Sequence, residues 1–90
     1  MTKALITVTG ADATGIIARV ATCLAEMNVN ILKITQTIMD GYFTMMMVVD
    51  LDTSALDFTQ IDNNLDAVRK ELNMMIHMQR MDVYEAMHRV

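Results

Sequence analysis

The segment from Tyr42 to Leu51 restricts the possible folds more than any other, because it is apolar on both sides of a strand. One side would carry Phe43, Met45, Met47, Val49 and Leu51, and the other Tyr42, Thr44, Met46 and Val48. A strand with two apolar sides is covered on both. A chain of 90 residues has little material for a second cover, so we expect another copy to supply it.

The dipeptide Asp40-Gly41, just before this segment, predicts a tight hairpin because both residues accept positive φ. The strand that enters the turn is predicted from Asn30 to Met39, with Leu32, Ile34 and Ile38 on one side.

The remaining elements follow from hydrophobic periodicity. Lys3 to Thr9 and Met74 to Met81 are predicted strands. Apolar residues recur at steps of three and four from Ile17 to Met27 and from Phe58 to Leu72, which predicts two amphipathic helices. Asp82 begins a further short helix that would reach Val90.

This order defines an α+β, ferredoxin-like βαββαβ sandwich. We expect a four-stranded antiparallel sheet with two helices on one face, plus a short C-terminal helix, in a single domain over residues 1–90.

Polar residues indicate where the two main helices begin and end. Asp12 is a candidate N-cap of the first helix, and Asn28 or Asn30 can end it in the left-handed conformation. Asp57 and Gln60 have the spacing of a capping box for the second.

Charge and hydropathy exclude several classes of protein. Seven Lys and Arg against 11 Asp and Glu give a net charge of −4, which argues against nucleic acid as a partner. The longest dense apolar run, Met45 to Val49, is too short to span a membrane. No leader precedes the first strand, so a cytoplasmic location is expected.

The chain offers no set of residues for catalysis or metal binding. His77 is expected on a strand surface, His88 at a helix end, and the single cysteine, Cys23, in the core. None has partners at ligand or triad spacing. We therefore expect no enzyme activity, no catalytic residues, no metal and no cofactor.

Three motifs in this order resemble the ACT domain family. They are the loop GADATG (Gly10–Gly15), Val29-Asn30-Ile31 at the start of the second strand, and Gly41-Tyr42-Phe43-Thr44-Met45 entering the third. The ending from Asp82 to Val90 is similar to that of free-standing bacterial ACT proteins of uncharacterised function. Thr14 departs from the pattern, since many members carry proline there.

The resemblance implies a ligand site between the first loop of one chain and strand two of another. On this chain it corresponds to Gly10, Ala11, Asp12, Thr14, Gly15, Ile16, Asn30 and Ile31.

Each main candidate has a structural alternative. Asp12 either holds a ligand ammonium group or only caps the helix, and Gly15 either admits a ligand or only allows helix–strand packing. Asn30 either contacts the ligand or is a turn residue, and Gln36 either bridges subunits or bonds locally.

Two functions remain open. The first is a homodimeric or larger regulatory module that binds a small-molecule effector, expected to be an amino acid. The second is a protein-interaction subunit of a metabolic enzyme or regulator, with no ligand of its own.

Overall fold

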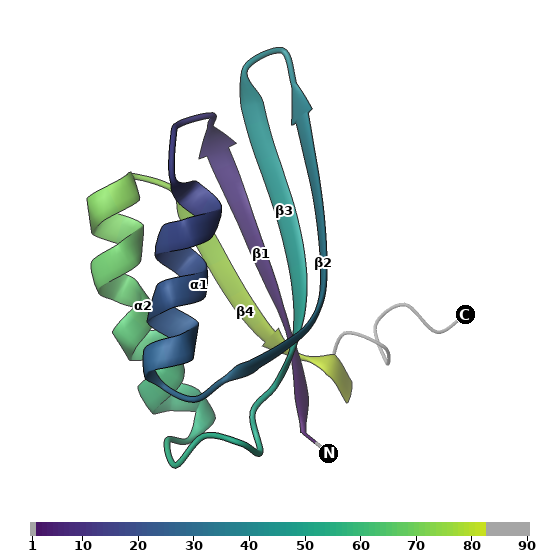
Figure 1. The fold of residues 1–90 in the computed structure, drawn as a ribbon, viewed down its shortest axis with the longest axis vertical. Coiled ribbons are helices and arrows are strands. Elements are labelled where there is room, and N and C mark those ends of the chain that lie inside the picture. Colours follow the sequence, from purple (N-terminus) through teal and green to yellow (C-terminus); the bar gives the residue numbers. More distant parts are fainter. Residues whose placement is uncertain (1, 83–90) are drawn as a thin grey trace.

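The computed structural model describes residues 2–82. Its elements run in the order β1 (Lys3–Ala11), α1 (Ile16–Glu26), β2 (Asn30–Met39), β3 (Tyr42–Asp50), α2 (Phe58–Leu72) and β4 (Met75–Arg80). The four strands form one antiparallel sheet in the order β2-β3-β1-β4. Both helices lie on the same side of this sheet (Figure 1), which confirms the ferredoxin-like prediction. The predicted terminal helix falls on residues 83–90, outside the described part.

The sheet registers show which side of each strand faces the helices. Ile6 of β1 lies opposite Met47 of β3 and Met78 of β4, and all three are buried in the core. The same alternation extends along β1 and β3, so every second residue packs beneath α1 and α2. Burying the Met47 side chain in this way contributes about 1.5–3 kcal/mol.

Turns form where left-handed residues were predicted. Asp40 (φ 51°) and Gly41 (φ 80°) both have positive φ in the hairpin between β2 and β3. Asn28 (φ 58°) takes the same conformation just after α1. These local preferences therefore direct the chain into β2 and from β2 into β3.

Several predicted boundaries were wrong. β1 continues through Gly10 and Ala11, because both pair with the start of β3. β3 ends at Asp50, so Leu51 is buried outside the strand. In β2, an irregularity between Ile31 and Lys33 interrupts the expected alternation at Leu32, whereas Ile34 and Ile38 share the side that faces the helices.

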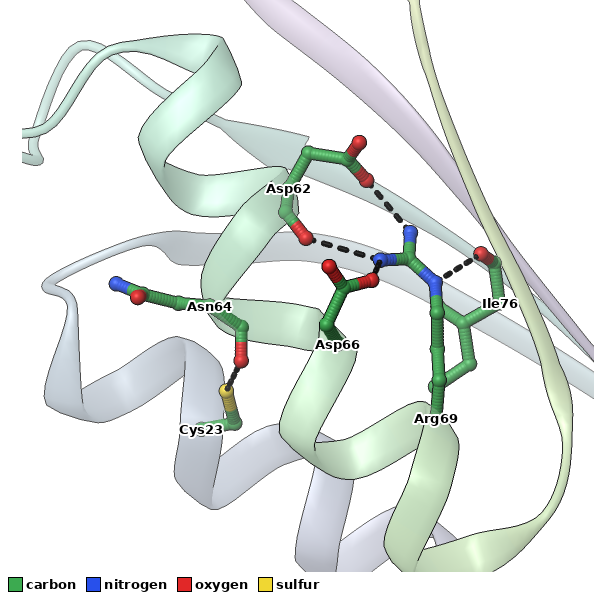
Figure 2. A network of polar contacts seen from close by, with 6 residues as sticks. All are labelled: Cys23, Asp62, Asn64, Asp66, Arg69 and Ile76. Carbon is green, nitrogen blue, oxygen red and sulfur yellow. Dashed lines mark hydrogen bonds and ion pairs between the residues drawn. The ribbon is translucent and has the colours of Figure 1, made fainter.

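The second helix is tied to β4 by one arginine (Figure 2). The Arg69 Nε donates to the Ile76 carbonyl at 2.7 Å, and its terminal nitrogens donate to the carboxylates of Asp62 and Asp66. Partial burial alone would lower the pKa of Arg69, but the two carboxylates outweigh it and raise this pKa. Arg69 thus joins the helix to the sheet.

The capping box of Asp57 and Gln60 is present as predicted. The Gln60 backbone N–H donates to Asp57 Oδ1 at 2.8 Å, and the Asp57 backbone N–H donates to Gln60 Oε1 at 2.9 Å. The two bonds satisfy N–H groups that would otherwise lack partners at the start of α2.

The strand β2 lies at an edge of the sheet that the helices do not cover. Every residue of β2 except Ile31 is exposed, and Ile34 and Ile38 are 41% and 57% exposed although they point to the helix side. Within the described residues, the sheet side opposite the helices has no covering layer (Figure 1). The second cover expected for β3 is therefore not part of the described fold.

Candidate functional site

The loop from Asp12 to Gly15 joins β1 to α1 and is exposed throughout. The Asp12 backbone N–H donates to the Gly41 carbonyl at 2.8 Å, which ties the loop to the hairpin between β2 and β3. This bond holds the loop at the same end of the molecule as the hairpin, where β2 ends.

The first helix begins without a side-chain cap. Gly15 is its N-cap, with φ 84°, and no side chain bonds to this position. The prediction that Asp12 caps α1 was therefore wrong, because three residues separate this carboxylate from the first helical residue, Ile16. The first N–H groups of α1 lack the usual partner and carry the positive end of the helix dipole, and no acidic residue lies in the first turn.

The two loop glycines have different roles. A Cβ on Gly15 would meet nothing within 4 Å, so glycine is favoured there by its positive φ and not by close helix–strand packing. A Cβ on Gly10 would lie 3.0 Å from Met74 Cε and 3.1 Å from its Cγ. An alanine at position 10, within β1, would therefore require the side chain of the buried Met74 to shift by a few tenths of an ångström.

A cavity of about 270 Å³ lies between this loop and the sheet edge. Its lining comes from the loop and first turn of α1, and from β2 and β3: Asp12, Ala13, Gly15, Ile16, Ile17, Ala18, Gln36, Ile38 and Phe43. It combines free helix N–H groups, one carboxylate, one amide and several apolar walls. This is slightly below the volume range of pockets for drug-sized ligands, and suits a smaller molecule.

Three of the eight predicted site residues line this cavity, namely Asp12, Gly15 and Ile16. Thr14 lies within the same loop, whereas Gly10 and Ala11 are in β1. The sequence analysis did not predict Ile38 or Phe43 as site residues. The predicted hairpin turn was the available signal for them, because it places the end of β2 and the start of β3 beside the loop.

Asn30 and Ile31 lie far from the loop within one chain. They begin β2 at the C-terminal end of α1, and the 11 residues of that helix separate them from Gly15 by about 16 Å. Asn30 lines a different, shallow hollow with Asn28 and Thr53. The two predicted halves of the site, the loop before α1 and the start of β2, thus lie at opposite ends of α1 within one chain.

Other chemistry-bearing side chains have structural roles. The Cys23 thiol is buried and donates weakly to the Asn64 carbonyl at 3.9 Å (Figure 2). Burial raises the pKa of Cys23, against the opposing charge of Arg19. His77 is exposed on β4, as predicted.

Residues 2–82 carry neither a metal-ligand cluster nor a membrane-spanning helix. No three His, Cys, Asp or Glu side chains of that range are grouped as metal ligands would be. Neither α1 nor α2 has the length and hydrophobicity needed to cross a bilayer.

Comparison with known proteins defines the class. Residues 2–79 match the ACT domain family. A UPF0237 protein of Bifidobacterium longum is 48% identical over 90 residues, 100% of both chains. A UPF0237 protein of Clostridium acetobutylicum is 48% identical over 88 residues, 98% of this chain and 99% of its own. The solved structure of an ACT domain protein from Streptococcus pneumoniae is 44% identical, covers 93% of this chain and 94% of that chain, and has a TM-score of 0.80.

The chain belongs to the ACT domain family. ACT domains are regulatory modules that bind small molecules, often amino acids. The resemblance to single-domain ACT proteins of uncharacterised function is confirmed by the two UPF0237 relatives, which match along their length.

Proposed function

We propose that this protein is a regulatory module, without enzyme activity, that binds an amino acid where two copies of the chain meet. The observation that carries the proposal is the cavity beside the uncapped start of α1, at the edge strand β2. We also propose that the protein is cytoplasmic, where the concentrations of free amino acids vary with metabolism.

The cavity lining complements the parts of an amino acid. The free N–H groups at the start of α1 favour a carboxylate. The Asp12 carboxylate, which does not cap the helix, is available for an ammonium group. Ile16, Ile38 and Phe43 provide apolar contact for a side chain, and the Gln36 amide can both donate and accept.

The position of β2 at the edge of the described sheet supports the homodimer. An exposed edge strand with large aliphatic side chains pairs readily with a second strand. If β2 pairs antiparallel with its own copy about a two-fold axis at the strand centre, the partner's Ile31 lies opposite Ile38. The partner's Asn30 then lies opposite Met39, beside the loop that carries Asp12. Two copies would therefore join the halves of the site that one chain keeps apart.

A thermal-shift screen with the twenty standard amino acids tests the proposal. A ligand at 100 times its Kd stabilises the folded state by about 2.7 kcal/mol, which raises Tm by roughly 11–22 °C in a domain of this size. Asp12→Ala should abolish the shift while leaving the unliganded Tm nearly unchanged, because its side chain caps nothing. Glu26→Ala, an equal loss of charge at the other end of α1, should keep the shift.

The absence of a shift with every amino acid, confirmed by calorimetry, would contradict the proposal. A shift that survives Asp12→Ala would move the site away from this loop.

The alternative function is a protein-interaction subunit. It is favoured by large exposed apolar residues on the sheet, including Met39, Tyr42 and Met75, which are 67%, 68% and 72% exposed. Co-purification of a partner enzyme at fixed stoichiometry, unaffected by amino acids, would support this function over the first.

A further inference from the structure

The strand β4 forms the second edge of the described sheet, at the opposite side from β2 (Figure 1). An edge strand directs part of its backbone N–H and C=O groups outward, where another extended chain can pair with them. Which residues of β4 these are follows from the hydrogen bonds between β1 and β3, because the two sides of β1 alternate along the strand.

Two bonds at the ends of the β1–β3 ladder determine this alternation. The Leu51 N–H donates to the Thr2 carbonyl at 2.9 Å, and the Asp12 N–H donates to the Gly41 carbonyl at 2.8 Å. Both bonds continue the register of the ladder, and both join an even-numbered residue of the first segment to β3. The even-numbered residues of β1 therefore bond to β3, and the odd-numbered residues bond to β4.

The register of β4 then gives the direction of its own backbone groups. His77 and Gln79 lie opposite the odd-numbered residues Thr7 and Leu5, so they bond to β1. The alternate residues of β4 turn their N–H and C=O groups outward: these are Ile76, Met78 and Arg80. A further strand would have to bind these groups.

The side chain of Arg69 occupies the first of the outward groups (Figure 2). Its Nε donates to the Ile76 carbonyl at 2.7 Å. Its Nη1 donates to the Asp62 carbonyl at 2.9 Å and to Asp66 Oδ1 at 2.5 Å, and its Nη2 donates to Asp62 Oδ1 at 2.5 Å. The Arg69 side chain is only 23% exposed. The two aspartates of α2 thus hold a charged donor against the edge of β4.

This arrangement obstructs the addition of a strand. An incoming strand would need the Ile76 carbonyl as acceptor, and would have to displace the Arg69 guanidinium from it. Without Ile76, only Met78 and Arg80 remain for pairing, which is shorter than the strands of ordinary sheets. Charged side chains at an edge strand are a common protection against pairing with another chain.

The other edge of the sheet lacks this protection within the described chain. Among residues 2–82, no side chain forms a hydrogen bond with the backbone of β2. The two edges therefore differ, because a charged side chain of the chain itself covers part of β4 and none covers β2 in the same way.

We infer that Arg69 closes the β4 edge of the sheet, so that copies of this chain do not pair through β4. Arg69 then has a role in limiting assembly, in addition to joining α2 to the sheet. The inference does not involve the ligand cavity, so its failure would leave the proposed function unaffected.

Arg69→Met tests the inference in the full chain, because methionine keeps an unbranched side chain but removes the charge and all donors. Light scattering coupled to size-exclusion chromatography should show at least a doubling of the wild-type mass, which increases with protein concentration. Arg19→Met is the matched control, since it removes the ion pair with Glu71 between the two helices and leaves the sheet edge untouched. This control should keep the wild-type mass, and circular dichroism shows whether each variant is folded.

Amide hydrogen exchange followed by NMR identifies the surface that forms any larger assembly. In the wild type, the outward N–H of Met78 should exchange much faster than the N–H of His77, which bonds to β1. In the Arg69→Met assembly, the Met78 N–H should become protected, because it then donates to a second chain.

Three results would overturn the inference. One is a folded Arg69→Met variant that keeps the wild-type mass at every concentration. Another is a larger assembly in which the Met78 N–H exchanges as fast as in the wild type, because a different surface would then form it. The third is a Met78 N–H as protected as that of His77 in the wild type, a result that decides the question even if Arg69→Met does not fold.

Discussion

Replacement of Gly15 by alanine tests the geometry on which the site depends. Gly15 has φ 84° and open space around its missing Cβ, so the variant meets strain without a clash. A non-glycine residue in the left-handed region costs about 1–2 kcal/mol. The loss of backbone freedom in the unfolded chain returns about 0.4–1 kcal/mol. Gly15→Ala should therefore lower the free energy of unfolding by roughly 1 kcal/mol and Tm by about 4–8 °C.

Gly15→Asn is the matched variant, because asparagine tolerates positive φ better than alanine does. The chain already places Asn28 and Asn73 at φ 58° and 52°. We expect Gly15→Asn to lose less than half as much stability as Gly15→Ala.

Urea unfolding followed by circular dichroism, at one fixed protein concentration, measures both losses. An alanine variant as stable as the wild type would refute the left-handed cap at Gly15. Equal losses for Ala and Asn would mean that space, and not φ, selects glycine there.

Three further measurements examine other parts of the fold. Asp57→Ala should cost about 0.5–2 kcal/mol of unfolding free energy, measured by urea titration, since it removes the acceptor for Gln60; no loss would show that the capping box is dispensable. The raised pKa and burial of Cys23 should make native alkylation at pH 7 far slower than alkylation in urea, and equal rates would contradict its burial. The Thr2 backbone N–H lowers the pKa of Asp52, so its carboxylate should titrate by NMR below 3.8. The Thr2 contact should persist at neutral pH and be lost only as pH falls through that lowered pKa; a titration midpoint at or above the ordinary value would disprove the contact.

The fold was largely predictable because local and long-range signals agree. The hairpin at Asp40-Gly41, the helical stripes and the capping box at Asp57 each specify one element. Once the order βαββαβ is established, few topologies remain. Side-chain periodicity also grouped Phe43, Met45, Met47 and Val49 on one side of β3, and these four residues are buried in the core.

The start of α1 could not be predicted because two signals competed. Asp12 is a preferred cap residue, yet the pairing of Gly10 and Ala11 with β3 extends β1 and carries the chain past that position. The helix then begins at a left-handed Gly15, as its conformational freedom allows. Tertiary pairing thus overrode a local preference.

The candidate site was only half predictable. The loop residues follow from the motif, but Ile38 and Phe43 reach the cavity through the hairpin, whose two strands lie far from the loop in sequence. The amino-acid composition of β2 did not predict that this strand is exposed either. Ile34 and Ile38 are as apolar as core residues and are exposed only because the helices do not extend over that edge.

A site built from the loop of one copy and β2 of another can be tested by mixing two inactive variants. Asp12→Ala impairs the loop half and Asn30→Ala the β2 half. A mixed dimer of these chains contains one site with both alanines and one site with neither. Asn63→Ala makes the same change on the exposed side of α2, outside the proposed site, and serves as the control for Asn30→Ala.

The measurement is calorimetric titration of the mixed variants, after exchange of subunits, with the amino acid that gives the largest thermal shift. We predict that each variant alone binds weakly, and that the mixture regains wild-type affinity at about one quarter of its sites, as random pairing requires. A mixture that binds no better than its components would contradict the two-chain site.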